Sequence, residues 1–121
     1  MIRLLVLAFL LGFVPLWLRS RNAERQLSLA RIENSLASAA IDARRGVYET
    51  ARQAASDFFT YLRTEFNRGV DSALSQTDIA SLQPLLTRRD EIITLLARGD
   101  AASADLLSDL YALYRAIVNR Q

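Results

Sequence analysis

The 121-residue sequence predicts an all-α protein, in which a single N-terminal transmembrane helix continues into a small four-helix bundle, or two αα-hairpins. Three observations predict this class. Leu4–Leu18 is uncharged and apolar, the apolar residues after it recur at helical spacing, and the glycines stand singly between amphipathic segments. We therefore divide the chain into a transmembrane anchor over residues 1–21 and an extramembrane helical domain over residues 22–121.

The length and flanks of Leu4–Leu18 favour an uncleaved membrane span. As a helix, fifteen residues cover about 22 Å against a hydrocarbon core of about 30 Å. Arg3 and Arg19 can extend toward the headgroups, and Trp17 suits the interface. Two alternatives remain open. A secretory signal lacks a small-x-small cleavage site here, and a buried soluble helix lacks a polar face.

Ala8 and Gly12 form a small-x-x-x-small pair within the predicted span. Such pairs let two helices approach closely in lipid, because neither residue carries a bulky side chain. We therefore name Ala8 and Gly12 as candidate membrane-packing residues.

The location that we predict is the bacterial inner (cytoplasmic) membrane, crossed once. Arg19, Arg21 and Arg25 follow the span, while Arg3 and the amino terminus precede it. The positive-inside rule slightly favours a cytoplasmic helical domain, although many bacterial anchors with short tails export theirs. Both orientations stay open at this stage.

The first predicted hairpin covers about residues 24–68. No glycine or proline occurs between Leu16 and Arg45, so one helix can leave the membrane without interruption. Gly46 is the expected helix stop, and a second helix follows from Tyr48 to Phe66. The expected core positions of these two helices are Leu29, Ile32, Leu36, Ala39, Ala40, Ala43, Ala51, Ala55, Phe58, Phe59, Leu62 and Phe66.

The second predicted hairpin covers about residues 77–120. Ser75 or Thr77 can cap its first helix, and Asp100 its second. Because proline is tolerated at a helix start, we expect a short turn over residues 79–82 and the main helix from Pro84 to Gly99. The expected core positions are Leu85, Leu86, Ile92, Ile93, Leu96, Leu106, Leu107, Leu110, Leu113, Tyr114, Ile117 and Val118. Arg98-Gly99 repeats the Arg45-Gly46 pair 53 residues later.

The segment RRGVYETARQAA resembles the inter-helix turn of a tetratricopeptide repeat, with Gly46, Tyr48 and Ala51 at the family's glycine, aromatic and alanine positions. The resemblance covers only about residues 45–55. The first helix of the repeat carries a large aromatic residue and a leucine-glycine pair, and this chain departs from that pattern with Ser35, Ser38 and Ala39. What the resemblance implies is a binding or scaffold role.

The composition excludes several kinds of chemistry. The chain has no cysteine and no histidine, which excludes disulfides, catalytic cysteines and histidine-based triads or metal sites. From Glu24 onward twelve arginines face thirteen acidic residues, a balance near −1 that argues against nucleic-acid binding. Carboxylate pairs such as Glu65 and Asp71 are expected on the solvated surface. We predict no catalytic residue, no cofactor and no bound metal.

These observations favour a non-catalytic accessory or assembly subunit of a larger membrane complex, such as respiratory, photosynthetic or secretion machinery. Its expected partners are other subunits of that complex and the lipid bilayer. The alternative is a membrane-tethered binding module for a peptide or small ligand. Tyr61 and Tyr111 lie at or beyond the edges of their apolar stripes, and they are the candidate partner contacts if exposed.

Overall fold

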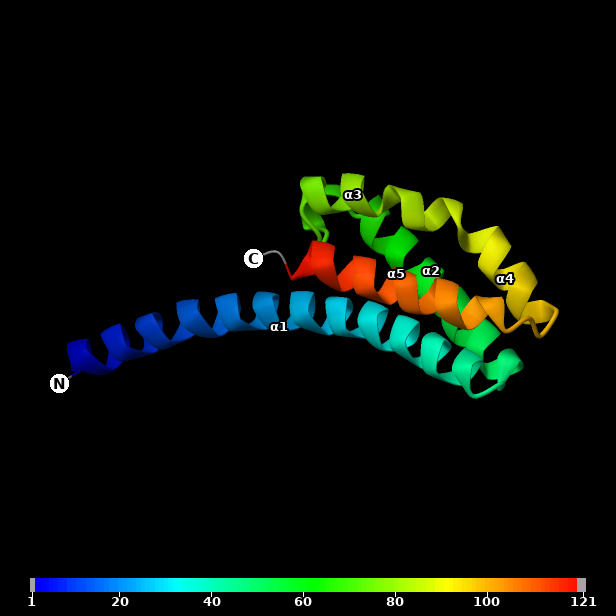
Figure 1. Ribbon diagram of the computed structural model, residues 1–121. Helices are drawn as coiled ribbons and strands as arrows, with labels where there is room; N and C mark the ends of the chain where they lie inside the picture. The colour runs from blue at the N-terminus through cyan, green and yellow to red at the C-terminus, as the bar shows by residue number, and fades with distance from the viewer. Residues whose placement is uncertain (1, 120–121) are drawn as a thin grey trace.

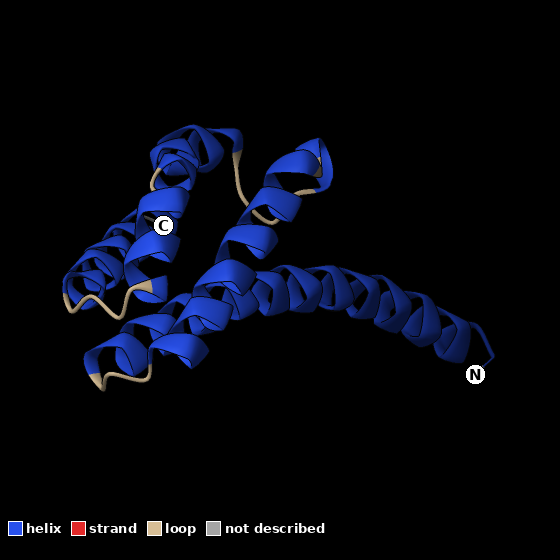
Figure 2. Cartoon of the chain, turned by 90° about the vertical axis from the view of Figure 1, so that its right-hand side faces the viewer, coloured by secondary structure: helices blue, strands red, loops and turns tan. Residues whose placement is uncertain are grey.

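The computed structural model describes residues 2–119, with side chains described for residues 23–119, and every regular element in it is helical (Figures 1 and 2). This confirms the all-α class. The elements, in chain order, are α1 (Ile2–Arg44), α2 (Tyr48–Asn67), the 3-10 helix η1 (Gly69–Asp71), α3 (Gln76–Thr87), α4 (Arg89–Ala97) and α5 (Ala102–Val118). The N-terminal part of α1 extends beyond the bundle that the other helices form (Figure 1).

Within the part of the chain whose side chains are described, no helix combines the length and the apolar character needed to cross a membrane. The predicted span Leu4–Leu18, with the candidate packing residues Ala8 and Gly12, lies outside that part.

Two turns of the same geometry end α1 and α4. Gly46 has a φ of 78°, its N–H donates to the Ala43 carbonyl at 3.1 Å, and the Val47 N–H donates to the Asp42 carbonyl at 2.8 Å. This double hydrogen bond is a Schellman motif, which requires a left-handed residue that glycine adopts without strain. The predicted stop at Gly46 is confirmed.

Gly99 repeats this motif after α4, with a φ of 66°. Its N–H donates to the Leu96 carbonyl at 3.1 Å, and the Asp100 N–H donates to the Leu95 carbonyl at 2.9 Å. The residue directly before α5 is Ala101, so the predicted cap Asp100 lies one residue too early, although its carboxylate accepts from the Ala102 N–H at 2.9 Å. A Cβ on Gly99 would lie 3.4 Å from a ring carbon of Tyr48, so the two turns meet at one end of the bundle.

The core lies between α1, α2 and α5, with α4 against α2 and α3 against α5. Its aromatic centre is Phe58, whose ring meets Phe59 edge-on at 5.0 Å and Tyr114 at 6.2 Å. Most of the predicted core positions are buried. Leu113 was predicted wrongly: it lies on α5 with 46% of its surface exposed, because Leu110, Tyr114 and Ile117 already fill the inward face.

The expected helix start at Pro84 is also wrong. α3 begins at Gln76, with the Ser75 hydroxyl accepting from the Asp78 N–H at 3.1 Å, and Pro84 lies inside it. Leu82 and Leu85 are buried on either side of Pro84. Their burial offsets the backbone hydrogen bond that proline cannot make. The helix breaks only at Arg88, before α4.

Glu65 corrects the expectation that the carboxylates are solvated. Its side chain is 5% exposed, and its Oε2 accepts from the Ser72 hydroxyl at 3.1 Å and from the Ala73 N–H at 2.8 Å. The Arg68 guanidinium lies 3.4 Å from Oε1. Since a buried carboxylate needs such partners, Glu65 fixes the chain that leaves α2 for α3.

We expect Glu65→Ala to lower the free energy of unfolding by about 2 to 3 kcal/mol, because the Ser72 hydroxyl and the Ala73 N–H lose a charged acceptor. Circular dichroism during urea unfolding of the purified chain measures this loss. Asp57→Ala is the matched control, because Asp57 is an exposed acidic residue on the same helix. An equal effect of both substitutions would contradict this role of Glu65.

Candidate interaction surfaces

Tyr111, one of the two predicted partner contacts, is half-buried on α5 and is held against α1. Its hydroxyl donates to Glu33 Oε1 at 3.3 Å. Arg115 Nε lies 3.4 Å from the same carboxylate oxygen, and the guanidinium lies 5.9 Å from the Tyr111 ring centroid. Part of the Tyr111 surface is therefore used within the chain.

Tyr61, the other predicted contact, is half-buried on α2. The Arg31 guanidinium of α1 lies 5.7 Å from its ring centroid, within cation–π range. Tyr61 and Tyr111 thus contact different residues of α1 from different helices. Each keeps a partly exposed ring that a partner could reach.

Tyr114 is the most strongly perturbed titratable group among residues 23–119. It is 1% exposed, and its hydroxyl donates to the Leu29 carbonyl at 3.3 Å. Burial raises the pKa of the phenol well above its ordinary value, and the negative charges of Glu33, Glu65 and Asp78 add to this shift. The phenol therefore stays neutral at physiological pH and acts as a core residue.

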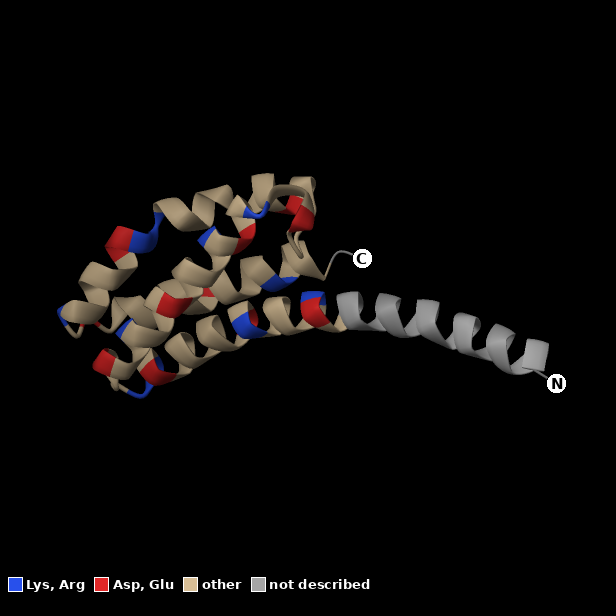
Figure 3. Ribbon diagram, turned by 180° about the vertical axis from the view of Figure 1, so that it is seen from behind, with Lys and Arg blue, Asp and Glu red and all other residues tan. Residues whose placement is uncertain are grey.

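Among residues 23–119, no three or more carboxylates lie close enough together to hold a metal ion. Acidic and basic positions are interspersed along the helices of the bundle (Figure 3). An ion pair of 3.2 Å between Arg44 and Asp105 links α1 to α5 at the surface. Such exposed pairs contribute little to stability and offer no concentrated charge to a ligand.

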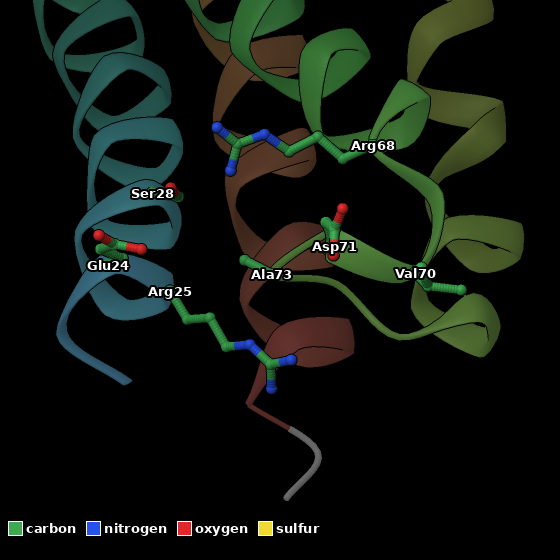
Figure 4. Close-up of a pocket in the computed structure, with 7 residues that line it drawn as sticks. All are labelled: Glu24, Arg25, Ser28, Arg68, Val70, Asp71 and Ala73. Carbon is green, nitrogen blue, oxygen red and sulfur yellow. The ribbon is translucent and has the colours of Figure 1, made fainter. Parts of the chain in front are cut away.

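One candidate surface lies at the end of the bundle from which α1 extends. Val70 of η1 is 91% exposed there. Beside it is an open hollow of about 440 Å³, into which Arg25 of α1 and Arg68 at the end of α2 reach from opposite sides (Figure 4). Val70 points away from α1 in the same view. The hollow is polar and shallow, unlike a typical small-molecule site.

The second candidate surface is the outer face of α1, opposite the core. Leu27 and Ile41 are 59% and 58% exposed, and Ala30 and Asn34 between them are also exposed. Beside Ile41 is a shallow, mainly apolar hollow of about 290 Å³, lined by Ala37, Ala40, Ile41, Arg44, Ser108 and Tyr111. Sequence reasoning missed this face, although the seven-residue spacing of Leu27, Asn34 and Ile41 could have indicated it.

Comparisons of this chain with protein-family models, with curated proteins and with solved structures found no match.

We expect Tyr114→Phe to remove a stability loss at high pH. The unfolded chain releases the phenolic proton near pH 10, whereas the folded chain holds it, so stability falls as the pH rises from about 10 to 12. Urea unfolding at pH 8, 10 and 11 measures this slope. Tyr111→Phe is the control, because it keeps Tyr114 and should keep the slope. A slope unchanged by Tyr114→Phe would contradict the assignment.

Proposed function

We propose that this chain is a non-catalytic structural subunit of a larger membrane complex, anchored in the bacterial inner membrane by the segment Leu4–Leu18. The main support is the continuity of α1 from Ile2 to Arg44. The helix that carries the apolar segment also supplies Ile32 and Leu36 to the core. An anchor built this way fixes the position of the helical domain relative to the membrane, which suits a positioning role.

The energetics of the apolar segment support anchorage. Eleven of its fifteen residues are Leu, Val or Phe, and at roughly −0.3 to −0.6 kcal/mol each they favour insertion by about −3 to −7 kcal/mol. Arginine at the centre of a span opposes insertion by about 3 kcal/mol. Two arginines would therefore cancel most of this gain.

A membrane-tethered module that binds a peptide or small ligand is the second candidate. The observation that favours it is the mainly apolar hollow between Ile41 and Tyr111. Against it, the rings of Tyr61 and Tyr111 are partly covered by contacts with α1. A binding module should purify as a stable chain without partners, whereas a subunit should co-purify with other proteins in fixed stoichiometry.

We expect the wild-type chain to remain in the membrane pellet after carbonate washing, and Leu10→Arg combined with Phe13→Arg to release it. Immunoblotting of pellet and supernatant measures the partition. Leu113→Arg is the control, because Leu113 is an exposed apolar residue of α5 and should not change the partition. Release of the wild-type chain would overturn the anchor.

We expect the tagged chain, purified from membranes in mild detergent, to bring down other membrane proteins in constant ratio. Native mass spectrometry measures the composition of the particle. Tyr61→Ala and Tyr111→Ala should weaken this recovery if the two rings are partner contacts, and Thr50→Ala on the exposed surface of α2 is the control. A particle that contains only this chain would contradict the subunit proposal.

A further inference from the structure

α1 carries two apolar faces, of which the described helices cover only one. The covered face holds Ile32, Leu36, Ala39 and Ala43, all at most 2% exposed. The outer stripe, as we call the opposite face, consists of Leu27, Ala30, Asn34, Ala37 and Ile41. Leu27 and Ile41 are the large apolar residues of α1 with the greatest exposure among residues 23–44.

The outer stripe has the spacing of a coiled-coil seam. Leu27, Asn34 and Ile41 are seven residues apart, as are Ala30 and Ala37, so these five residues occupy the a and d positions of two heptads. None of the five is charged. A seven-residue repeat keeps one seam in contact only with a helix that runs alongside and supercoils with it. Over two heptads this spacing is the one expected for contact with a helix that runs alongside α1. The inner face, where Ile32 and Ala39 are also seven residues apart, packs in this way against α2 and α5.

We infer that the outer stripe is a parallel dimerisation seam between α1 and the α1 of a second copy of this chain. Asn34 lies at the centre of the stripe, and its amide carries both donor and acceptor groups. In a symmetric parallel pair the two Asn34 side chains would face each other and hydrogen-bond. A buried asparagine at one a position sets the register and favours two strands.

The flanking residues are compatible with this parallel pairing. In the same heptad register Gln26 of one copy lies opposite Arg31 of the other, and Glu33 lies opposite Ser38. No like charges meet across these two pairs. Small residues at Ala30 and Ala37 would let the two helix backbones approach closely, because alanine adds little bulk to the seam.

The backbone of α1 supports a covered outer face. Surface helices normally curve with the convex side toward solvent. α1 is bowed the other way, with its concave side turned away from the rest of the bundle (Figure 1). A helix that supercoils with a partner on its outer side curves toward that partner.

The helical register also links the stripe to the predicted membrane span. Ala23 lies one turn before Leu27, and Gly12 lies eleven residues, or about three turns, before Ala23. The glycine of the predicted packing pair thus falls on the same side of α1 as the stripe. Two heptads form a short seam. Because α1 is already helical within its own bundle, dimerisation does not carry the entropic cost of folding this helix.

Disulfide cross-linking tests the seam directly, because the natural chain contains no cysteine. Single substitutions Leu27→Cys, Asn34→Cys and Ile41→Cys are oxidised in native membranes of the full chain and run on non-reducing gels. The controls are Arg25→Cys, exposed on the other side of α1, and Leu113→Cys, exposed on α5. We expect at least about fivefold more dimer at the seam positions, since a disulfide needs Cβ atoms about 4 Å apart.

A second variant tests whether the apolar residues drive association. Leu27→Asp with Ile41→Asp, placed in the Asn34→Cys chain, should abolish the dimer band, whereas Leu113→Asp should leave it unchanged. Circular dichroism confirms that each variant is folded. Equal cross-linking at seam and control positions, or a band at the mass of a different protein, would overturn the homodimer.

This inference rests on the outer stripe and not on the complex proposed above. Carbonate washing reports on the anchor, and cross-linking reports on the seam, so the two can fail separately. If the chain leaves the membrane on washing, the same cysteine variants are oxidised in the soluble fraction. Seam-specific dimers there would still support the pairing, and their absence would refute it.

Discussion

The apolar ridge of Ile32, Leu36, Ala39 and Ala43 on α1 is the constraint on which the fold depends. α2 and α5 both pack against α1, whereas α4 contacts α2 and α5, and α3 contacts α5. Alanines at the turn end of the ridge, matched by Ala51 and Ala55 on α2, leave room for close helix approach. Farther from the turn the ridge carries the larger Ile32 and Leu36, and the rings of Phe58 on α2 and Tyr114 on α5 meet in the core. The size gradient along α1 therefore orients the other helices.

Much of this arrangement could be predicted from local patterns. The stops at Gly46 and Gly99 follow from the left-handed conformation of a Schellman turn, which is a property of a few residues. The core faces of α1 and α2 follow from helical periodicity. Pro84 and Glu65 could not be placed this way, because both depend on tertiary contacts. Pro84 is tolerated by burial of Leu82 and Leu85, and Glu65 is satisfied by Ser72 and Ala73, which follow in the next loop.

The candidate surfaces were harder to predict than the fold. Tyr61 and Tyr111 were chosen because they lie at or beyond the edges of their stripes, yet edge residues are the ones that a neighbouring helix half-covers. Leu27 and Ile41 were missed for a different reason. The core stripe of α1 already accounts for its helical periodicity, and Leu27 and Ile41 are separated by polar and small residues that are typical of a solvent-exposed surface. Only burial separates the two faces.

The two faces of α1 impose different demands on neighbouring positions. The residues of the apolar ridge are almost completely buried. The space between α1, α2 and α5 therefore limits the size of their side chains. Outer-stripe residues can change without affecting that space, because their side chains point away from it. Asn34 and Leu36 are two residues apart, and a helix places them on nearly opposite sides. A polar residue is therefore tolerated at Asn34 where it would be destabilising at Leu36. Asn34 is exposed on the outer face, and in the proposed pairing of two α1 helices it lies at the centre of the seam.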